Sequence, residues 1–243
     1  MKRMGKLIEL GRMFFAAAMA AFGILYLLHA SFGAGPGAGP PWMPAPPFWA
    51  YFTAVVCLLA AAAIVANIQV RCAAILLAVT IFLRVLLNFV PKLAANPRDP
   101  GPWTSGGELL SLCGAALVLA GFPVLVRIGR LLFALPLLIF GIQHFLFARY
   151  IATLVPSSIP GPRFWAVFAG MGFVVSAISI VTLIQGRLAA TWLGIMFLLW
   201  VMILHLPRVT ASPHNGNEWT SAIVALAMSG AAFLVAGSLK QES

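Results

Sequence analysis

The chain has 243 residues, of which 62% are hydrophobic and only 8% are charged. Soluble domains carry about 25% charged residues because their surface must be hydrated, so this composition excludes an ordinary water-soluble domain. The formal net charge is +10, but the basic residues stand singly between apolar stretches, which argues against nucleic-acid binding. The lipid bilayer is therefore a predicted partner, and no nucleic-acid partner is expected.

Eight apolar segments follow one another along the chain. Each approaches the roughly 20 residues that an α-helix needs to cross the hydrocarbon, and none alternates as a barrel strand would. Runs rich in proline and glycine separate them, such as 33–47 and 155–162, and the least clear break lies at 121–127. The predicted fold is an all-α membrane protein with eight transmembrane helices at 7–29, 49–68, 72–90, 107–126, 128–148, 164–184, 188–206 and 219–238.

The two halves of the chain align with each other. GRMFFAAAMAAFGI at 11–24 matches GRLLFALPLLIFGI at 129–142 at an offset of 118, and beyond the first proline-rich loop the offset is 116, so that Arg71 meets Arg187. This pattern predicts an internal duplication. Because four spans return the chain to its starting side, the repeats should be parallel. The predicted domains are two four-helix bundles, the first at 1–126 and the second at 127–243.

Lysine and arginine residues are unevenly divided between the two sides that the spans define. Nine lie at the termini and turns of one side, and five lie in the opposite loops. The positive-inside rule then predicts cytoplasmic N- and C-termini. Residues 1–30 resemble a signal peptide, but the same pattern recurs at 129–148, so we expect the first span to be retained.

Ionisable residues of the second repeat are predicted to reach one depth near the outer interface. His144 and His205 lie 17 and 18 residues beyond the arginines that open their spans, or roughly 26 Å along each helix. Glu218 opens the last span at that level, with Arg208 nearby. Such a set could form a ligand or proton-accepting site, for a quinone head for example, or a polar cluster that orients the helices. Two histidines and one carboxylate on separate helices are a weak metal pattern, so no metal is predicted.

A second intramembrane set consists of Arg84, Asn88 and Glu108. Arg84 and Asn88 are four residues apart and share a helix face. Glu108 enters from the outer side to a similar depth, and an isolated charge in lipid would cost several kcal/mol. We therefore predict a structural polar pair between Arg84 and Glu108.

Neither polar set is present in both repeats. The residues aligned with Arg84 and Glu108 are Trp200 and Val224, so the two charges are absent together, as expected for a pair. The residues of the first repeat aligned with the outer cluster are likewise different, namely Tyr26, Phe89 and Pro102. A functional site built on the histidines should therefore lie in the second repeat.

The second half contains five characteristic short motifs, namely FGIQHF at 140–145, VPSSIPGP at 155–162, RLAA at 187–190, LHLPR at 204–208 and NEWTS at 217–221. Together these motifs resemble the DoxX-like family of bacterial membrane proteins. The resemblance covers 127–238 well and the first half more loosely. It implies a four-helix unit, here in tandem, in a bacterial cytoplasmic (inner) membrane. Some members are subunits of a thiosulfate:quinone oxidoreductase, and most have no assigned activity.

Three functions follow as hypotheses. The first is a quinone- or redox-linked membrane subunit that uses His144, His205 and Glu218 and works with an oxidoreductase partner. The second is a non-catalytic module for membrane assembly, which would not depend on the histidines. The third is a small-molecule transporter, although few polar residues are available to line a path. The residues do not identify a cofactor beyond the suggested quinone, and whether the chain is an enzyme stays open.

Overall fold

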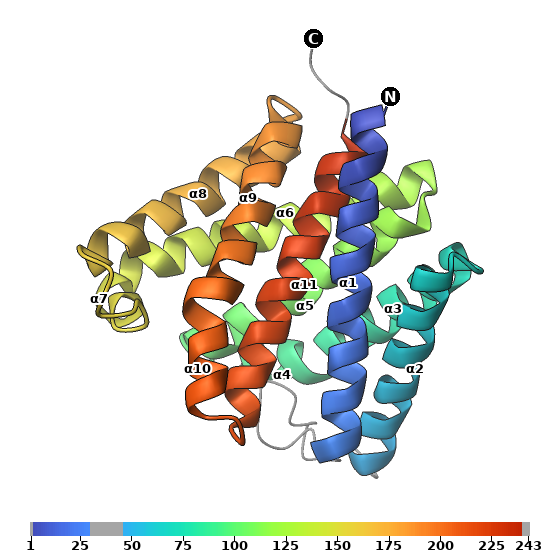
Figure 1. Ribbon diagram of the computed structural model, residues 1–243, viewed down its shortest axis with the longest axis horizontal. Coiled ribbons are helices and arrows are strands. Elements are labelled where there is room, and N and C mark those ends of the chain that lie inside the picture. The colour runs from blue at the N-terminus through green and yellow to red at the C-terminus, as the bar shows by residue number, and fades with distance from the viewer. Residues whose placement is uncertain (1, 30–45, 240–243) are drawn as a thin grey trace.

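The computed structural model describes residues 2–29 and 46–239, where it consists of helices without a strand (Figure 1). Eight spans in these ranges are long and apolar enough to cross a membrane, which confirms the predicted all-α membrane fold. Of the predicted loop at 33–47, only the last two residues are described, and they open a helix. The elements are α1 (Lys2–His29), α2 (Pro46–Ala66), α3 (Val70–Arg84), η1 (Val85–Phe89), α4 (Val90–Ala95), α5 (Pro100–Ala120), α6 (Pro123–Leu146), α7 (Ala148–Ala152), α8 (Pro162–Thr182), α9 (Gly186–Trp200), η2 (Val201–His205), α10 (Leu206–Ala211) and α11 (Gly216–Ser238).

The break between α5 and α6 is shorter than the predicted one at 121–127. Gly121 adopts a left-handed backbone conformation (φ 76°) that ends α5. The next helix begins at Pro123, where the missing N–H and fixed φ suit a first turn. Only two residues therefore separate the fourth span from the fifth, which holds these two helices close together.

A π-helical turn interrupts the third and the seventh span at aligned positions. In η1 the N–H of Val90 bonds to the carbonyl of Val85, five residues back, and η2 ends in the same way. Pro91 and Pro207 follow, and each removes one backbone donor from the helix. The wide turn absorbs this misfit, so that both helices continue beyond the proline. The predicted ends of these spans at 90 and 206 are therefore wrong.

Local hydrogen bonds at the starts of α5 and α11 are the same in both halves. The side chains of Asp99 and Asn215 each accept a bond of 3.0 Å from the backbone N–H two residues on, which caps the helix. The indoles of Trp103 and Trp219 each donate a bond of 2.9 Å to the carbonyl of the proline six residues earlier. These pairs agree with the offset of 116 in the sequence, while the domain boundary at 126 stays a prediction.

The two halves pack against each other through their first and last spans. Within each half, consecutive spans are neighbours, in the order α1, α2, α3, α5 and α6, α8, α9, α11. The most extensive packing, however, joins α1 to α11 and α5 to α6, and α5 also touches α11. Figure 1 shows the described ends of the chain at the same end of the molecule, as an even number of spans per repeat requires.

Glycines bring the backbones of these helices into direct contact. A Cβ added to Gly114 of α5 would lie 2.4 Å from the carbonyl oxygen of Gly129 of α6. The aligned pair is Gly230 of α11 and Gly11 of α1, and a Cβ on Gly230 would lie 2.5 Å from the backbone nitrogen of Phe15. Small residues at helix crossings allow close packing in membranes, where lipid supplies no hydrophobic drive between helices. The two interfaces between the halves are therefore built alike.

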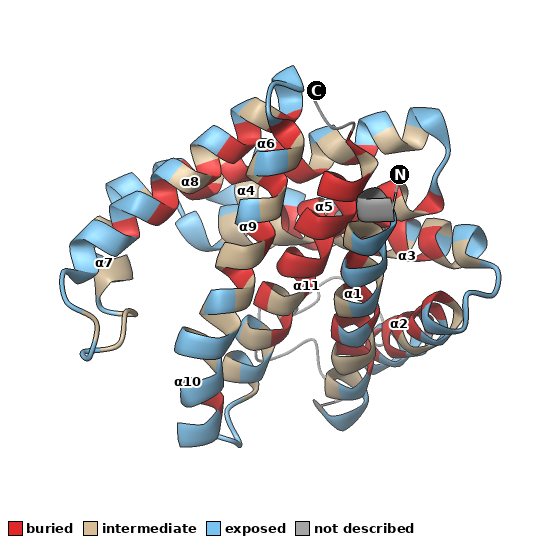
Figure 2. Cartoon of the chain, turned by 45° about the horizontal axis from the view of Figure 1, so that its top comes forward, coloured by how far each residue is buried: buried red, intermediate tan, exposed pale blue. Residues whose placement is uncertain are grey.

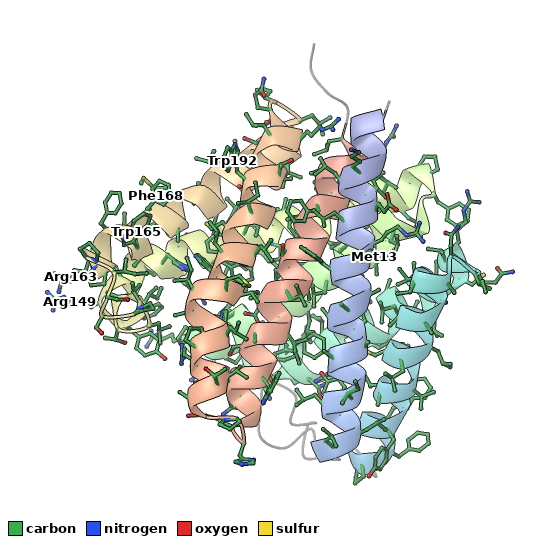
Figure 3. The ribbon with its side chains drawn as sticks, viewed as in Figure 1. Met13, Arg149, Arg163, Trp165, Phe168 and Trp192 are labelled. Atoms are coloured by element: carbon green, nitrogen blue, oxygen red, sulfur yellow. The ribbon has the colours of Figure 1, made fainter. Side chains whose placement is uncertain are left out.

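Burial divides the helices into central and peripheral ones. In α11, 72% of the most apolar stretch is buried, whereas the span containing α9 has only 22% buried. Figure 2 shows this contrast as a mostly red α11 beside blue and tan helices at the periphery. Figure 3 shows Trp165, Phe168 and Trp192 on the outside of α8 and α9, where they are 44%, 50% and 63% exposed. These aromatic side chains lie on the outer surface of the helix bundle.

Candidate functional site

The structure joins two members of the predicted outer cluster in an ion pair. Nη2 of Arg208 in α10 donates to Oε1 of Glu218 in α11 at 3.0 Å. Their side chains are 38% and 17% exposed, so solvent screening weakens the attraction between the two charges. Glu218 also stands in the first turn of α11, where a negative charge is favourable. The pair ties the two helices together beside the short turn that connects them.

His205 lies at the end of η2, three residues before Arg208 in the same span. Its Nδ1 is buried and has no hydrogen-bond partner among the described residues. This nitrogen could therefore form a hydrogen bond with a water molecule or with a polar group of a ligand.

His144 belongs to a different environment. Its Nδ1 lies 2.8 Å from the carbonyl oxygen of Phe140, and because a carbonyl only accepts, this nitrogen carries the proton. In the neutral ring Nε2 is then a hydrogen-bond acceptor. The imidazole centroid lies 5.0 Å from the ring centroid of Phe173 and 6.3 Å from that of Trp200, with Trp200 nearly parallel at 12°. Among the described residues, no hydrogen bond, ion pair or ring contact joins His144 to His205 or Glu218, and the cluster of all three stays a prediction.

The aromatic surroundings of His144 were not predicted as part of a site. Phe173 of α8 lies at their centre, with centroids 5.7 Å from Phe140, 5.7 Å from Phe197 and 5.8 Å from Trp200. Phenylalanine and tryptophan in an apolar span look like ordinary core residues, so composition alone gave no signal. Alignment of the halves could have found them, because Phe173 and Trp200 replace a cysteine and an arginine of the first half.

The predicted ion pair between Arg84 and Glu108 is not formed. Among the described residues, Arg208 and Glu218 make the one ion pair within 4.0 Å. Arg84 instead lies over the ring of Tyr26, with Cζ 4.8 Å from the centroid, and donates to its hydroxyl. Leu109 and Leu112 of α5 line the same cavity as Arg84, and Glu108 is not among the lining residues.

Asn88, the third member of this set, is buried in η1. It is 2% exposed, and its Oδ1 has no hydrogen-bond partner among the described residues. A buried amide oxygen without a donor is costly, and the structure shows no compensating contact for it.

The Tyr26–Arg84 contact and the His144–Trp200 contact occupy aligned positions in the two halves. Tyr26 and His144 differ by 118 residues, and Arg84 and Trp200 by 116, as the alignment requires. Each contact joins the first span of a half to the end of the α-helical part of the third, where the π-helical turn begins. The same place therefore holds a cation over a phenol in one half and an indole beside an imidazole in the other.

The first half has a cavity at this place. It offers about 20 Å³ of room for water-sized groups, and about 370 Å³ of empty space when its open mouth is counted. In the second half, the residue aligned with Cys57 is Phe173, and the one aligned with Ile81 is Phe197. The cavity is lined by Met19, Phe22, Tyr26, Thr53, Cys57, Leu77, Thr80, Ile81, Arg84, Leu109 and Leu112.

No cluster of three or more histidine, cysteine or carboxylate side chains that could hold a metal occurs in the described ranges 2–29 and 46–239.

Comparisons with known proteins do not extend these observations: no protein family, curated protein or solved structure matches this chain. The DoxX-like likeness therefore remains a resemblance of short motifs.

Proposed function

We propose that this chain is a redox-linked membrane subunit of DoxX-like type that binds a quinol-class ligand at the outer end of the second repeat. The observation that carries the proposal is the 2.8 Å distance between Nδ1 of His144 and the carbonyl oxygen of Phe140. With Nδ1 donating to the Phe140 carbonyl, Nε2 can accept a hydrogen bond from a ligand hydroxyl. A hydroquinone presents such a hydroxyl on a flat ring.

The aromatic residues around His144 support a flat ligand. Trp200 and Phe173 hold the imidazole by ring contacts, and aromatic side chains favour planar rings through stacking and edge contacts. A mostly apolar site with one well-placed polar atom is the usual form of a small-molecule site. His205, with its buried Nδ1, and the Arg208–Glu218 pair would supply further polar contacts near the same end of the second repeat.

In this proposal the chain lies in a bacterial inner membrane, with both termini in the cytoplasm. The uneven distribution of lysine and arginine supports this orientation. An oxidoreductase partner would exchange electrons with the bound quinone or quinol, as the family resemblance suggests. The non-catalytic assembly module and the transporter remain the alternatives, and neither needs an acceptor at His144.

Binding of a short-chain ubiquinol analogue to the purified chain in nanodiscs tests the proposal. We expect the quinol to bind more tightly than the corresponding quinone, because only the quinol can donate to Nε2. His144→Phe keeps a ring against Phe173 and Trp200 but removes the acceptor. Loss of one hydrogen bond of about 1.4 kcal/mol corresponds to a tenfold weaker Kd, which titration would measure.

His214→Phe is the matched control, because His214 is exposed in the turn before α11. It should leave the Kd of the quinol unchanged. An unchanged Kd in His144→Phe, or equal affinity for quinol and quinone, would instead favour the non-catalytic assembly module.

A further inference from the structure

Two arginines stand at the corner where α7 meets α8. Arg149 belongs to α7 and Arg163 to the first turn of α8, and these two helices pack against each other. Figure 3 shows both side chains at this corner, at the edge of the molecule. Both residues are exposed, and among the described residues neither takes part in an ion pair or a cation–π contact. The corner therefore presents two positive charges on the surface of the second repeat.

Three exposed aromatic rings continue from Arg163 along the outside of α8. The rings of Phe164 and Phe168 are stacked with centroids 5.8 Å apart, and Trp165 meets both edge-on at 5.3 Å and 5.9 Å. The indole N–H of Trp165 also donates a bond of 3.1 Å to the carbonyl of Pro160, which holds the ring in place. A charged end followed by an apolar face matches a lipid, in which a polar headgroup is followed by hydrocarbon chains.

The first half carries the same rings without the charges. Phe48, Trp49 and Phe52 of α2 make the aligned ring contacts, at 5.3 Å, 6.4 Å and 6.2 Å. The stretch 30–47 before them contains no charged residue, whereas 147–163 of the second half contains both arginines and no carboxylate. The general preference of aromatic side chains for the membrane interface accounts for rings in both halves. The arginines need a separate explanation, because they occur in one half only.

We propose that this corner binds the headgroup of an anionic phospholipid, with Arg149 and Arg163 at the phosphate and the acyl chains along the three rings of α8. The planar fork of a guanidinium matches the oxygens of a phosphate, and its hydrogen bonds to them are short and strong. A headgroup with a net negative charge is favoured over a zwitterionic one, whose own cation offsets the phosphate. The site does not rest on the quinol proposal, because it uses none of the residues around His144.

Native mass spectrometry of the purified chain tests this proposal. The delipidated chain in a mild detergent is titrated with dioleoylphosphatidylglycerol or dioleoylphosphatidylcholine, which share their acyl chains and differ in net charge. The measured quantity is the lipid concentration at which half of the chains carry a first bound lipid. We expect this concentration to be about tenfold lower for the anionic lipid. Equal values for the two lipids would overturn the proposal, because the charge of the headgroup would then play no part.

Two double variants separate this corner from the general attraction of a cationic protein for anionic lipid. Arg149→Gln/Arg163→Gln should weaken binding of the anionic lipid roughly 20-fold and leave the zwitterionic lipid unchanged. Lys92→Gln/Arg98→Gln is the matched control, because it removes the same charge from the first half, where Lys92 already lies over the ring of Phe89. It should bind the anionic lipid like the wild type. Equal weakening in both variants would contradict a site at the α7–α8 corner.

Two further results decide between this lipid and other occupants. Wild-type affinity for the anionic lipid in Arg149→Gln/Arg163→Gln would also overturn the proposal, and an acidic protein surface would then be the better partner for the two charges. Water-soluble glycerophosphoglycerol should not displace the bound lipid, because it lacks the chains that lie along α8, and displacement would contradict a lipid site. His144→Phe should retain the lipid whatever its effect on quinol binding, so the two proposals can fail separately.

Discussion

Replacing Gly114 by alanine is expected to destabilise the fold by about 3 kcal/mol, the upper part of the usual range for overpacking. The new Cβ would lie 2.4 Å from the carbonyl oxygen of Gly129 and 2.7 Å from the backbone nitrogen of Phe133. Both obstacles are backbone atoms, so no side-chain rotation relieves the clash and α5 must move away from α6. The free energy of unfolding, measured by SDS titration in mixed micelles, reports the loss.

Two further glycine variants test this prediction, one at the other interface and one as a control. Gly230→Ala should lose a similar amount, because the aligned Cβ would lie 2.5 Å from the nitrogen of Phe15 at the α1–α11 interface. Gly172→Ala is the control in α8, where the nearest atom is the Met196 sulfur at 3.6 Å, an ordinary contact. Alanine also favours a helix interior over glycine by up to about 1 kcal/mol, so this variant should be neutral or more stable. Equal stability of Gly114→Ala and Gly172→Ala would contradict the close packing of the halves.

Replacing Phe173 by alanine is expected to cost about 2 kcal/mol of unfolding free energy and to abolish quinol binding. Phe173 is 2% exposed and touches the rings of Phe140, His144, Phe197 and Trp200. Lipid is as apolar as the protein interior, so the free energy of transferring the side chain out of the protein contributes little. The free-energy cost of the cavity left behind, about 24 cal/mol per Å³ over roughly 100 Å³, remains. The released imidazole of His144 would also lose its orientation.

Phe168→Ala provides the matched control on the same helix. Phe168 is 50% exposed and points outward from α8 (Figure 3), so its removal leaves no internal cavity. The same SDS titration should give an unfolding free energy within about 0.5 kcal/mol of the wild type. If the two phenylalanine variants lost stability equally, the aromatic cluster would not be the packed core of the second repeat.

Much of this fold follows from the sequence because membrane physics leaves few alternatives. Apolar segments of about 20 residues must be helices in lipid, and proline and glycine runs must lie between them. The ends of the third and seventh spans were predicted wrongly for a physical reason. The predicted spans stop at 90 and 206, directly before Pro91 and Pro207, whereas a π-helical turn before each proline lets the helix continue.

The site was harder to predict because it depends on how helices rotate against one another. Depth along a helix follows from residue counting, and counting gave Arg84 and Glu108 similar depths. Facing direction does not follow from depth, and it is Leu109 that shares the cavity with Arg84. The sequence did contain a signal for the cavity, since Cys57 aligns with Phe173 and a volume difference of this kind is visible in the alignment of the halves.

The measurement that tests the central proposal most directly is the quinone content of the chain purified from its native membrane in a mild detergent. Extraction and mass spectrometry, counting quinol and quinone together, should recover about one molecule per chain from the wild type and from Arg84→Gln. The same extraction should recover little from His144→Phe. A wild-type chain that carries no quinone, or a His144→Phe chain that retains it, would contradict a quinol site in the second repeat.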